Sequence, residues 1–323
     1  MVKIAVVSCA DAVDDSEQSS WTNVIAHDPD CLVSLGDNIY MDWGKFNKRR
    51  LGAPKNWSDK KFAENMYDNY KRQWNVPSYQ QAVKAIHQIC VIWDDHDFAW
   101  NNSYGSDGVG SSQDEFFVWP ERRKISRALF EQFRAALAGK VVQYPPYPFS
   151  NGFSQVEDLG GIYQTVDLAN DIKLILTDGR TYRNPNKKDL LGQQQRSWLQ
   201  DQLLNLPAVN LIASGSTLRD KDSGWKIFQD WEWLKGLSSD HNILVLSGDI
   251  HTLQFNGSGE YGRIFEVVAS GIARPPGITR LAGKTTNNYA ILRIDLDQIT
   301  IDLCRKEELI QQSRIDRQRW AEL

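Results

Sequence analysis

The chain has 323 residues, enough for one large or two ordinary domains, and its 41% hydrophobic and 24% charged residues are typical of a globular protein with ample core material. The formal net charge of -4 gives the molecule as a whole no electrostatic reason to bind nucleic acid, and no nucleic-acid-binding module is evident. No apolar run approaches the roughly 18 to 20 residues that cross a bilayer, so we expect no membrane span.

The first apolar run, KIAVVS, predicts a β-strand at residues 3–8. It is too short for the apolar part of a signal peptide, and Asp11 follows at once. The four cysteines show no CxxC spacing, and three lie in or beside apolar runs, where a reduced, buried thiol is the expected state. We therefore expect a cytoplasmic location, although a chain that had lost a leader would look the same.

Six short, β-branched apolar runs follow one another along the chain, and each ends in a polar or acidic cluster. The clusters are Cys9-Ala10-Asp11, Asp37-Asn38, Asp94-Asp95-His96-Asp97, Asp178-Gly179-Arg180, Gly215-Ser216-Thr217 and Asp249-Ile250-His251. Such runs are typical of strands buried on both faces, and helical patterns at 121–138 and 193–204 lie between several of them. This alternation predicts an α/β fold with a largely parallel core. Because ligands bind beyond the carboxyl ends of such strands, six converging ends predict a site.

The C-terminal part has a different pattern. Three short strands and a charged terminal helix are expected there, over 264–269, 289–296, 298–304 and 305–322. The runs 161–168 and 172–177 predict a further hairpin. Antiparallel strands would thus flank the parallel core, in two sheets packed together and covered by helices. No Pro/Gly/Ser-rich linker divides the chain, so we expect a single domain over 1–323, completed by the elements from about 285.

Asp249 and His251 are spaced so that both side chains leave extended backbone on the same side. A carboxylate and an imidazole in that arrangement suit a divalent or trivalent metal ion. The D-x-H pattern alone is a weak signal, because a surface turn is the more common reason for it. Cys9 and Asp11 repeat the spacing, although a lone buried cysteine is more often part of the packing than a ligand.

The acidic strand ends would repel one another unless cations lay among them. Asp37 follows Gly36, whose missing side chain would allow backbone and metal to approach closely, and Asp95 adds a further carboxylate. Cations would relieve the repulsion among Asp37, Asp95 and Asp249 and lower their pKa values together. Two metal ions bridged by one carboxylate form the arrangement that hydrolyses phosphate esters.

The order of the motifs resembles the PhoD-like (alkaline phosphatase D-type) branch of the metallophosphoesterases. The motifs are SCAD, LVSLGDNIYMD, VIWDDHDFAWNN, LTDGRTYR, LLGQQQRSWL and LSGDIH, and together they cover roughly residues 1–275. Cys9-x-Asp11 and the final GDIH, in place of the wider superfamily's D-x-H and GHxH, are the departure that marks this branch. The resemblance implies a four-layer α/β/β/α sandwich of two mixed sheets. It also implies a metal-dependent phosphoric ester hydrolase, in which metal-bound hydroxide attacks a phosphomonoester or phosphodiester in line.

Position by position, the resemblance also implies metal ligands. One ferric ion (Fe3+) would be held by Cys9, Asp37, Tyr40 and Asp249, and one or two calcium ions (Ca2+) by Asp37 as bridge with Asp95, Asn102 and His251. Tyr40 agrees with this chemistry, since a phenolate ligand requires a strong Lewis acid; otherwise it is a packed ring with a satisfied hydroxyl. Asn102 offers a neutral oxygen suited to calcium, and Asn101 is the adjacent alternative.

Two further residues are candidates for catalysis. His96 has two interpretations: a general acid that protonates the leaving alkoxide, or a structural residue that orients Asp95 through a hydrogen bond. We favour the first because of its position. Arg180 carries a guanidinium fork that suits phosphate oxygens. Asp178 is expected to orient its neighbours, with Arg183 as its candidate partner.

The reaction would be set by the metal ligands, and the substrate by loops near 43–75, 104–120 and 271–288, so the choice between monoester and diester stays open. One alternative is a phosphodiesterase or phospholipase-type enzyme. The other, from a different class, is a catalytically silent metal- or anion-binding protein that kept the ligands and lost turnover.

Overall fold

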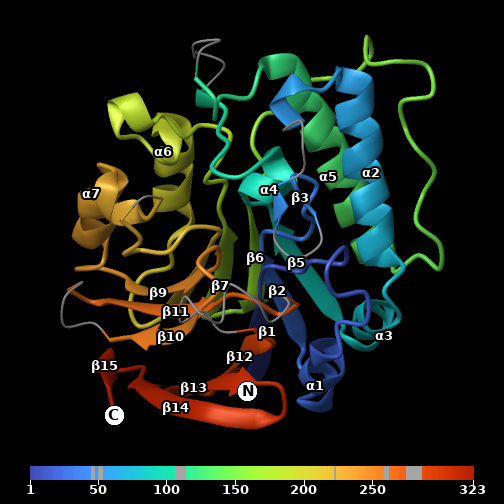
Figure 1. The fold of residues 1–323 in the computed structure, drawn as a ribbon. Helices are drawn as coiled ribbons and strands as arrows, with labels where there is room; N and C mark the ends of the chain where they lie inside the picture. Colours follow the sequence, from blue (N-terminus) through green and yellow to red (C-terminus); the bar gives the residue numbers. More distant parts are fainter. Residues whose placement is uncertain (45–47, 50–53, 107–113, 222, 258–261, 274–285) are drawn as a thin grey trace.

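Two mixed β-sheets pack face to face, with helices on both outer sides, in the computed structural model of the chain (Figure 1). The structure describes residues 1–44, 48–49, 54–106, 114–221, 223–257, 262–273 and 286–323. The predicted α/β/β/α class of fold is confirmed. The predicted substrate loops 104–120 and 271–288 lie partly outside the described residues, as does the start of 43–75.

The first sheet has the strand order β15-β14-β13-β12-β1-β2-β5. Its strands are β1 (Val2–Val7), β2 (Cys31–Leu35), β5 (Gln88–Ile92), β12 (Asn288–Ile294), β13 (Gln298–Arg305), β14 (Glu308–Asp316) and β15 (Ala321–Glu322). β1, β2 and β5 are parallel, whereas β12 to β15 are antiparallel to their neighbours. The N-terminal strand therefore lies between β2 and a C-terminal strand.

The second sheet has the order β10-β11-β9-β8-β7-β6. Its strands are β6 (Gln164–Ala169), β7 (Ile172–Leu176), β8 (Val209–Ser214), β9 (Asn242–Ser247), β10 (Leu253–Asn256) and β11 (Ile264–Ala269). The four inner strands are parallel and the two edge strands antiparallel. The hairpin predicted around 161–177 is confirmed as β6 and β7. A separate pair of two-residue strands, β3 (Trp43–Gly44) and β4 (Lys48–Arg49), follows the second acidic cluster.

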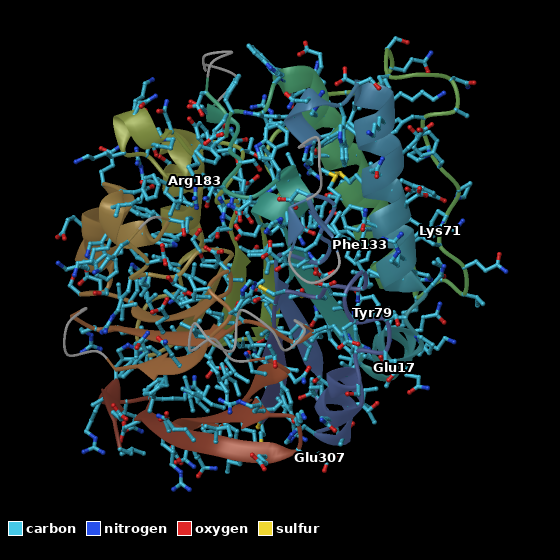
Figure 2. The ribbon with its side chains drawn as sticks, viewed as in Figure 1. Glu17, Lys71, Tyr79, Phe133, Arg183 and Glu307 are labelled. Carbon is cyan, nitrogen blue, oxygen red and sulfur yellow. The ribbon has the colours of Figure 1, made fainter. Side chains whose placement is uncertain are left out.

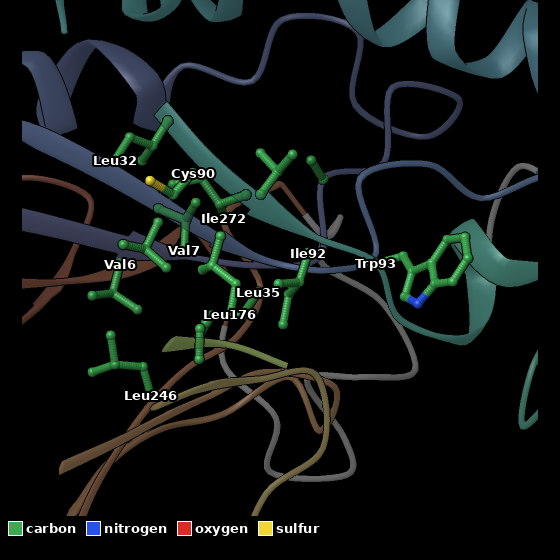
Figure 3. Packing of buried hydrophobic residues seen from close by; sticks show 14 of the residues in the cluster. Val6, Val7, Leu32, Leu35, Cys90, Ile92, Trp93, Leu176, Leu246 and Ile272 are labelled. Atoms are coloured by element: carbon green, nitrogen blue, oxygen red, sulfur yellow. The ribbon is translucent and has the colours of Figure 1, made fainter. Parts of the chain in front are cut away.

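The four inner strands of the second sheet are buried on both faces, which explains their continuous apolar runs. Leu174 and Leu211 belong to the core between the sheets, whereas Ile175 and Ile212, one residue further on, belong to a second cluster under helices α6 (Gly192–Gln202) and α7 (Asp230–Leu237). Figure 3 shows the central core from close by, where Leu35 and Ile92 of the first sheet face Leu176 and Leu246 of the second.

Helices α1 (Ser20–Ala26), α2 (Asp59–Trp74), α3 (Pro77–Ala85) and α5 (Pro120–Gly139) cover the first sheet, and the short α4 (Asp95–Phe98) directly follows β5. The start of α2 is fixed because the Ser58 side chain accepts a hydrogen bond from the amide of Lys61. The helices predicted at 121–138 and 193–204 are confirmed as α5 and α6. Within the described part of the chain, no helix is both long and apolar enough to cross a membrane.

The helix predicted over 305–322 is wrong. The chain turns at Lys306, which has a φ of 53°, and β14 returns along β13 as its antiparallel partner; Glu307 marks this turn at the edge of the molecule (Figure 2). Ser313 and Ile315 point inward, while most of β14 is exposed. Pairing with β13 outweighs the helical preference of the charged residues, which occupy the solvent face of an outer strand.

Candidate metal centre

The six polar clusters meet at the carboxyl ends of the two sheets, as the sequence predicts. The strand ends approach so closely that only glycine fits at two positions. A Cβ on Gly36 would lie 2.6 Å from the Cβ of Asp94, and a Cβ on Gly215 would lie 2.4 Å from the Asp94 Oδ1. Gly36 also has a φ of 97°, which favours glycine. The sequence suggested that Gly36 makes room for a metal; in the structure it makes room for the strand end at Asp94.

Five of the seven predicted metal ligands have backbone in the left-handed region, which residues other than glycine rarely adopt. Their φ angles are 62° for Cys9, 53° for Asp37, 63° for Asn102, 70° for Asp249 and 52° for His251. Each such residue costs about 1–3 kcal/mol and persists only where the surroundings hold it. Strain gathered on the predicted ligands supports a functional role for these turns.

Asp37 lies at the centre of the cluster. Its Oδ2 accepts a hydrogen bond from the Tyr40 hydroxyl at 2.8 Å and lies 3.5 Å from the Cys9 Sγ. Its Oδ1 is buried and has no hydrogen-bond partner among the described residues. Burial, and then the neighbouring carboxylates, raise the pKa of Asp37 well above its usual range despite the opposing effect of His96.

Two groups of potential metal ligands share Asp37. In the first, atoms of Cys9, Asp37 and His251 lie within 4.8 Å of one another; in the second, atoms of Asp37, Asp95 and His96 do so. A carboxylate with one orphaned oxygen between two donor groups is suited to bridge two cations. The first group offers a thiol, a carboxylate and an imidazole, and the second offers two carboxylates and an imidazole, so both contain donors that bind metal ions. The structure thus places His251 in the group of Cys9, whereas the sequence predicted it as a ligand beside Asp95.

The thiol of Cys9 is buried beside Ser270, whose Oγ lies 3.1 Å from the Sγ. Burial and the charge of Asp37 raise the pKa of Cys9 well above its ordinary value, so the thiolate form needs a cation beside it. The same Ser270 hydroxyl accepts a hydrogen bond from the backbone amide of His251, and the Nε2 of His251 lies 3.4 Å from the Tyr40 hydroxyl. Ser270 thus ties two predicted ligands together, a contact that sequence reasoning missed.

Asp249 belongs to neither three-residue group found among the described residues. The hydroxyl of Ser223 donates to its Oδ2 at 2.9 Å, and the backbone amide of Ser223 donates to Asp220. Burial, together with the charges of Asp94 and Asp95, raises the pKa of Asp249 to about 7. Asp249 approaches the Cys9 thiol with its backbone: its carbonyl oxygen lies 4.0 Å from the Sγ.

Asp95 lies at the start of α4, and its Oδ2 accepts a hydrogen bond from the amide of Asn102 at 2.6 Å. Burial acts to raise the pKa of Asp95, but Arg180 and His96 outweigh it and bring the pKa to about 2. The amide of Asn101 instead donates to Asp42. The structure therefore links Asn102, rather than Asn101, to a predicted ligand, although neither side chain is placed as a ligand by these contacts.

His96 is paired with a carboxylate that sequence reasoning missed. Its Nδ1 lies 2.7 Å from the Oδ1 of Asp42, and both side chains are buried. Burial disfavours the imidazolium, but Asp42, Asp95 and Asp37 outweigh it and raise the pKa of His96 to about 10. Because Asp42 accepts the Nδ1 proton, the Nε2 faces the cluster, 4.0 Å from the Oδ1 of Asp95.

Asp97, the last carboxylate of the DDHD motif, has a structural role. It accepts hydrogen bonds from the backbone amide and side chain of Asn38, from the hydroxyl of Tyr70 and from the amide of Asp94. Burial raises the pKa of Asp97 to about 7 against these favourable bonds. Asp97 therefore fastens the turn after β2 to the turn after β5.

Arg180 is fully buried, and its Nε donates to the Oδ1 of Asp94 at 2.6 Å. Its Nη2 lies 3.8 Å from the Oδ2 of Asp95, and neither Nη has a hydrogen-bond partner in the part of the chain that the structure describes. The two Nη groups therefore keep their hydrogen-bonding capacity, although Arg180 forms ion pairs with Asp94 and Asp95. That Arg180 contacts phosphate stays a prediction.

Asp178 orients the turn that carries Arg180, as predicted, by accepting hydrogen bonds from the amides of Arg180 and Thr181 and from the indole of Trp93. The suggested pairing of Arg183 with Asp178 is wrong. Arg183 donates to the carbonyl of Gly179 and to the hydroxyl of Ser216. Figure 2 shows Arg183 in the half of the molecule that carries α6.

The fold, with its polar cluster at the strand ends of two packed sheets, is that of the metallophosphoesterases. Residues 4–275 match the family model of the PhoD-like phosphatases, and the chain belongs to that family. A solved structure of PhoD aligns with 100% of this chain and 71% of its own, with a TM-score of 0.68 and 15% identity. The purple acid phosphatase PPD1 from yellow lupin (Lupinus luteus) seeds aligns with 98% of this chain and 53% of its own, with a TM-score of 0.52 and 10% identity. No curated protein sequence matches the chain.

Proposed function

We propose that the protein is a metal-dependent phosphoric ester hydrolase whose centre is built around Asp37. The observation that best supports this proposal concerns the Oδ1 of Asp37, which is buried and has no hydrogen-bond partner among the described residues. Asp37 also belongs to both groups of potential metal ligands. A buried carboxylate without a partner costs free energy unless a cation or donor meets it. Membership of the PhoD-like phosphatase family supports a phosphate ester as the class of substrate.

The proposed ligands divide into two sets that share Asp37. Fe3+ would be held by Cys9, Asp37, Tyr40 and Asp249, and Ca2+ by Asp37, Asp95, Asn102 and His251. Support for the first set comes from the buried thiol and from the Tyr40 hydroxyl 2.8 Å from Asp37. Support for the second comes from the closeness of Asp95 to Asp37 and from its bond to the amide of Asn102.

Metal ions bound there would lower the pKa of a coordinated water and so supply the nucleophile, while neutralising phosphoryl oxygens. The residues of the chain do the remaining work. His96, held by Asp42 at its Nδ1, would give a proton to the leaving oxygen through its Nε2, and its distance of 4.0 Å from the Asp95 Oδ1 supports this role. Arg180 holds Asp94 and Asp95 in place, and its two Nη groups are available to a phosphoryl oxygen.

The deciding experiment compares initial rates on p-nitrophenyl phosphate and bis-p-nitrophenyl phosphate before chelation, after chelation and after calcium is added back. We expect turnover to be lost on chelation and regained with calcium, and the ratio of the two rates to rank monoester against diester. Asp37→Asn should abolish both metal retention and turnover. Asp201→Asn, which also removes one carboxylate but from the exposed end of α6, is the matched control.

Metal identity is tested separately. Elemental analysis of protein grown with ample iron and calcium should find both, and a phenolate-to-iron absorption band should disappear in Tyr40→Phe. Zinc alone would contradict the assignment of iron to Tyr40. Folded, metal-loaded protein without turnover on either ester would favour the silent metal-binding alternative. The cytoplasmic location and the single domain over 1–323 stay predictions.

A further inference from the structure

Ser270 lies directly after β11 and is fully buried beside the candidate metal centre. Its backbone is held from two sides. Its amide donates to the carbonyl of Thr252, and its carbonyl accepts a hydrogen bond at 2.6 Å from the side chain of Asn288, the first residue of β12. Because Ser270 ends a strand of one sheet and is bound by a strand of the other, its place at the strand ends is fixed.

The turn that carries Cys9 is paired with the segment that follows Ser270. The amide of Gly271 donates to the carbonyl of Ser8, and the amide of Ala273 donates to the carbonyl of Cys9. This pairing holds the thiol against the hydroxyl, so that the Cys9 Sγ lies 3.1 Å from the Ser270 Oγ. The contact between sulfur and hydroxyl is therefore supported by backbone hydrogen bonds on both sides.

The neighbouring groups decide where the proton of the Ser270 hydroxyl points. The backbone amide of His251 donates to the Oγ at 2.9 Å, so the oxygen already accepts one hydrogen bond. Among the described residues, the Cys9 Sγ is the one acceptor beside this hydroxyl. A thiolate carries no proton and can only accept a hydrogen bond. When Cys9 binds a metal ion as a thiolate, the Ser270 hydroxyl therefore donates to its sulfur.

Ser8 provides a comparison at the same sulfur. Its Oγ lies 3.4 Å from the Cys9 Sγ, farther away than the Oγ of Ser270, and it also donates to the carbonyl of Ala269 at 3.2 Å. The proton of Ser8 thus has a backbone acceptor, whereas that of Ser270 has only the sulfur. Of the two buried hydroxyls, Ser270 has the stronger claim to the thiolate.

We propose that Ser270 is a positioning residue of the metal centre, whose hydroxyl donates a hydrogen bond to the metal-bound sulfur of Cys9. Such a bond withdraws electron density from the thiolate, so the metal ion that the thiolate binds becomes more electron-poor. An electron-poor ferric ion is a stronger Lewis acid, which the proposed hydrolysis uses. This inference rests on the metal ligands of the proposed function, because it requires iron at Cys9 and Tyr40.

The test measures the electronic state of the iron as well as the rate, in the metal-loaded full chain. S270A should lower the reduction potential of the iron, because the sulfur then donates more strongly. It should also move the phenolate-to-iron absorption band to shorter wavelength, since charge transfer to a less electron-poor ion requires more energy. We expect kcat on p-nitrophenyl phosphate to fall about 10- to 100-fold. A purely structural role would lower stability and leave the band in place.

S8A is the matched control, because it removes the more distant hydroxyl from the same sulfur; its band shift should be smaller than that of S270A. S270T and S270V form a second pair. Their side chains have nearly the same shape, but only threonine keeps the hydroxyl. S270T should therefore keep the band closer to its wild-type position than S270V, in which the added methyl group also fills the space that a water molecule would need.

An unshifted band in S270A, or equal shifts in S270A and S8A, would overturn the inference while leaving the proposed function intact. Metal-dependent turnover by wild-type protein that has no phenolate-to-iron band would overturn the inference together with the assignment of iron. Wild-type protein that shows the band but no turnover on either ester would overturn the proposed hydrolase, and a shift in S270A would then still support the hydrogen bond to sulfur.

Discussion

Replacing Arg180 by methionine should destabilise the protein strongly, because it leaves the Asp94 carboxylate buried without its counter-charge. The Arg180 Nε lies 2.6 Å from the Asp94 Oδ1, and the two side chains are 0% and 2% exposed. Breaking such a buried pair costs about 3–5 kcal/mol. If urea changes the free energy of unfolding by about 3 kcal/mol per molar, which suits a chain of this size, the midpoint should fall by roughly 1 to 1.7 M.

The assay is urea unfolding of chelated protein, followed by tryptophan fluorescence, so that altered metal affinity does not enter the result. The double variant D94N/R180M removes both charges and should be more stable than R180M alone. Without Arg180 the folded-state pKa of Asp94, already raised by burial, rises further above its unfolded value. R180M should therefore lose more stability at pH 8 than at pH 5. Equal losses at both pH values, or additive effects of the two substitutions, would refute the reasoning.

Three more predictions follow from single contacts. Gly36→Ala should lower the free energy of unfolding, measured with urea, by roughly 2–6 kcal/mol, because the new Cβ would clash with Asp94 and the φ of 97° would strain the alanine backbone. Gly152→Ala is the control: Gly152 has a φ of 88° but no atom within 4 Å of the added Cβ, so only the backbone strain should remain. Asp42→Asn should lower kcat about 10²- to 10⁴-fold with little change in KM, since His96 loses the acceptor that fixes it; unchanged kcat would remove His96 from proton transfer. Burial raises the pKa of Glu266 above 4.5, so its stabilising contribution is complete below pH 4.5 and declines as pH rises through the folded pKa. Wild type should therefore gain stability relative to Glu266→Gln between pH 7 and pH 5, and a constant difference would count against it.

The parallel strands of the core were predictable from the sequence, because a strand buried on both faces is a continuous run of apolar residues. Runs such as KIAVVS and ILVLSG have no polar face, and their polar ends must meet at one edge of a parallel sheet. The C-terminal strand was not predictable from local preference. Its charged residues favour a helix in isolation, and only pairing with β13 along Gln298–Arg305 overrides that preference.

The candidate ligands came from the motifs, but the residues that hold them did not. Asp42 and Ser223 are remote in the chain from His96 and Asp249, the residues they contact, so no spacing rule finds them. Asp97 was visible within DDHD, yet its function as an anchor for Asn38 depends on a turn 59 residues away. The carboxylates of one motif thus took different roles for reasons that lie in tertiary contacts.

The central position of β1 has a consequence for how the protein is made. β1 leads directly to Cys9, and its second neighbour, β12, begins at Asn288, beyond the end of the family match at residue 275. Until that part has left the ribosome, β1 has an unpaired edge, which invites pairing with other chains. A fragment cut at the limit of the family resemblance would keep every proposed ligand and still present that edge. The sheet that carries Cys9 and Asp37 is therefore completed late in synthesis, by strands that contribute none of the proposed ligands.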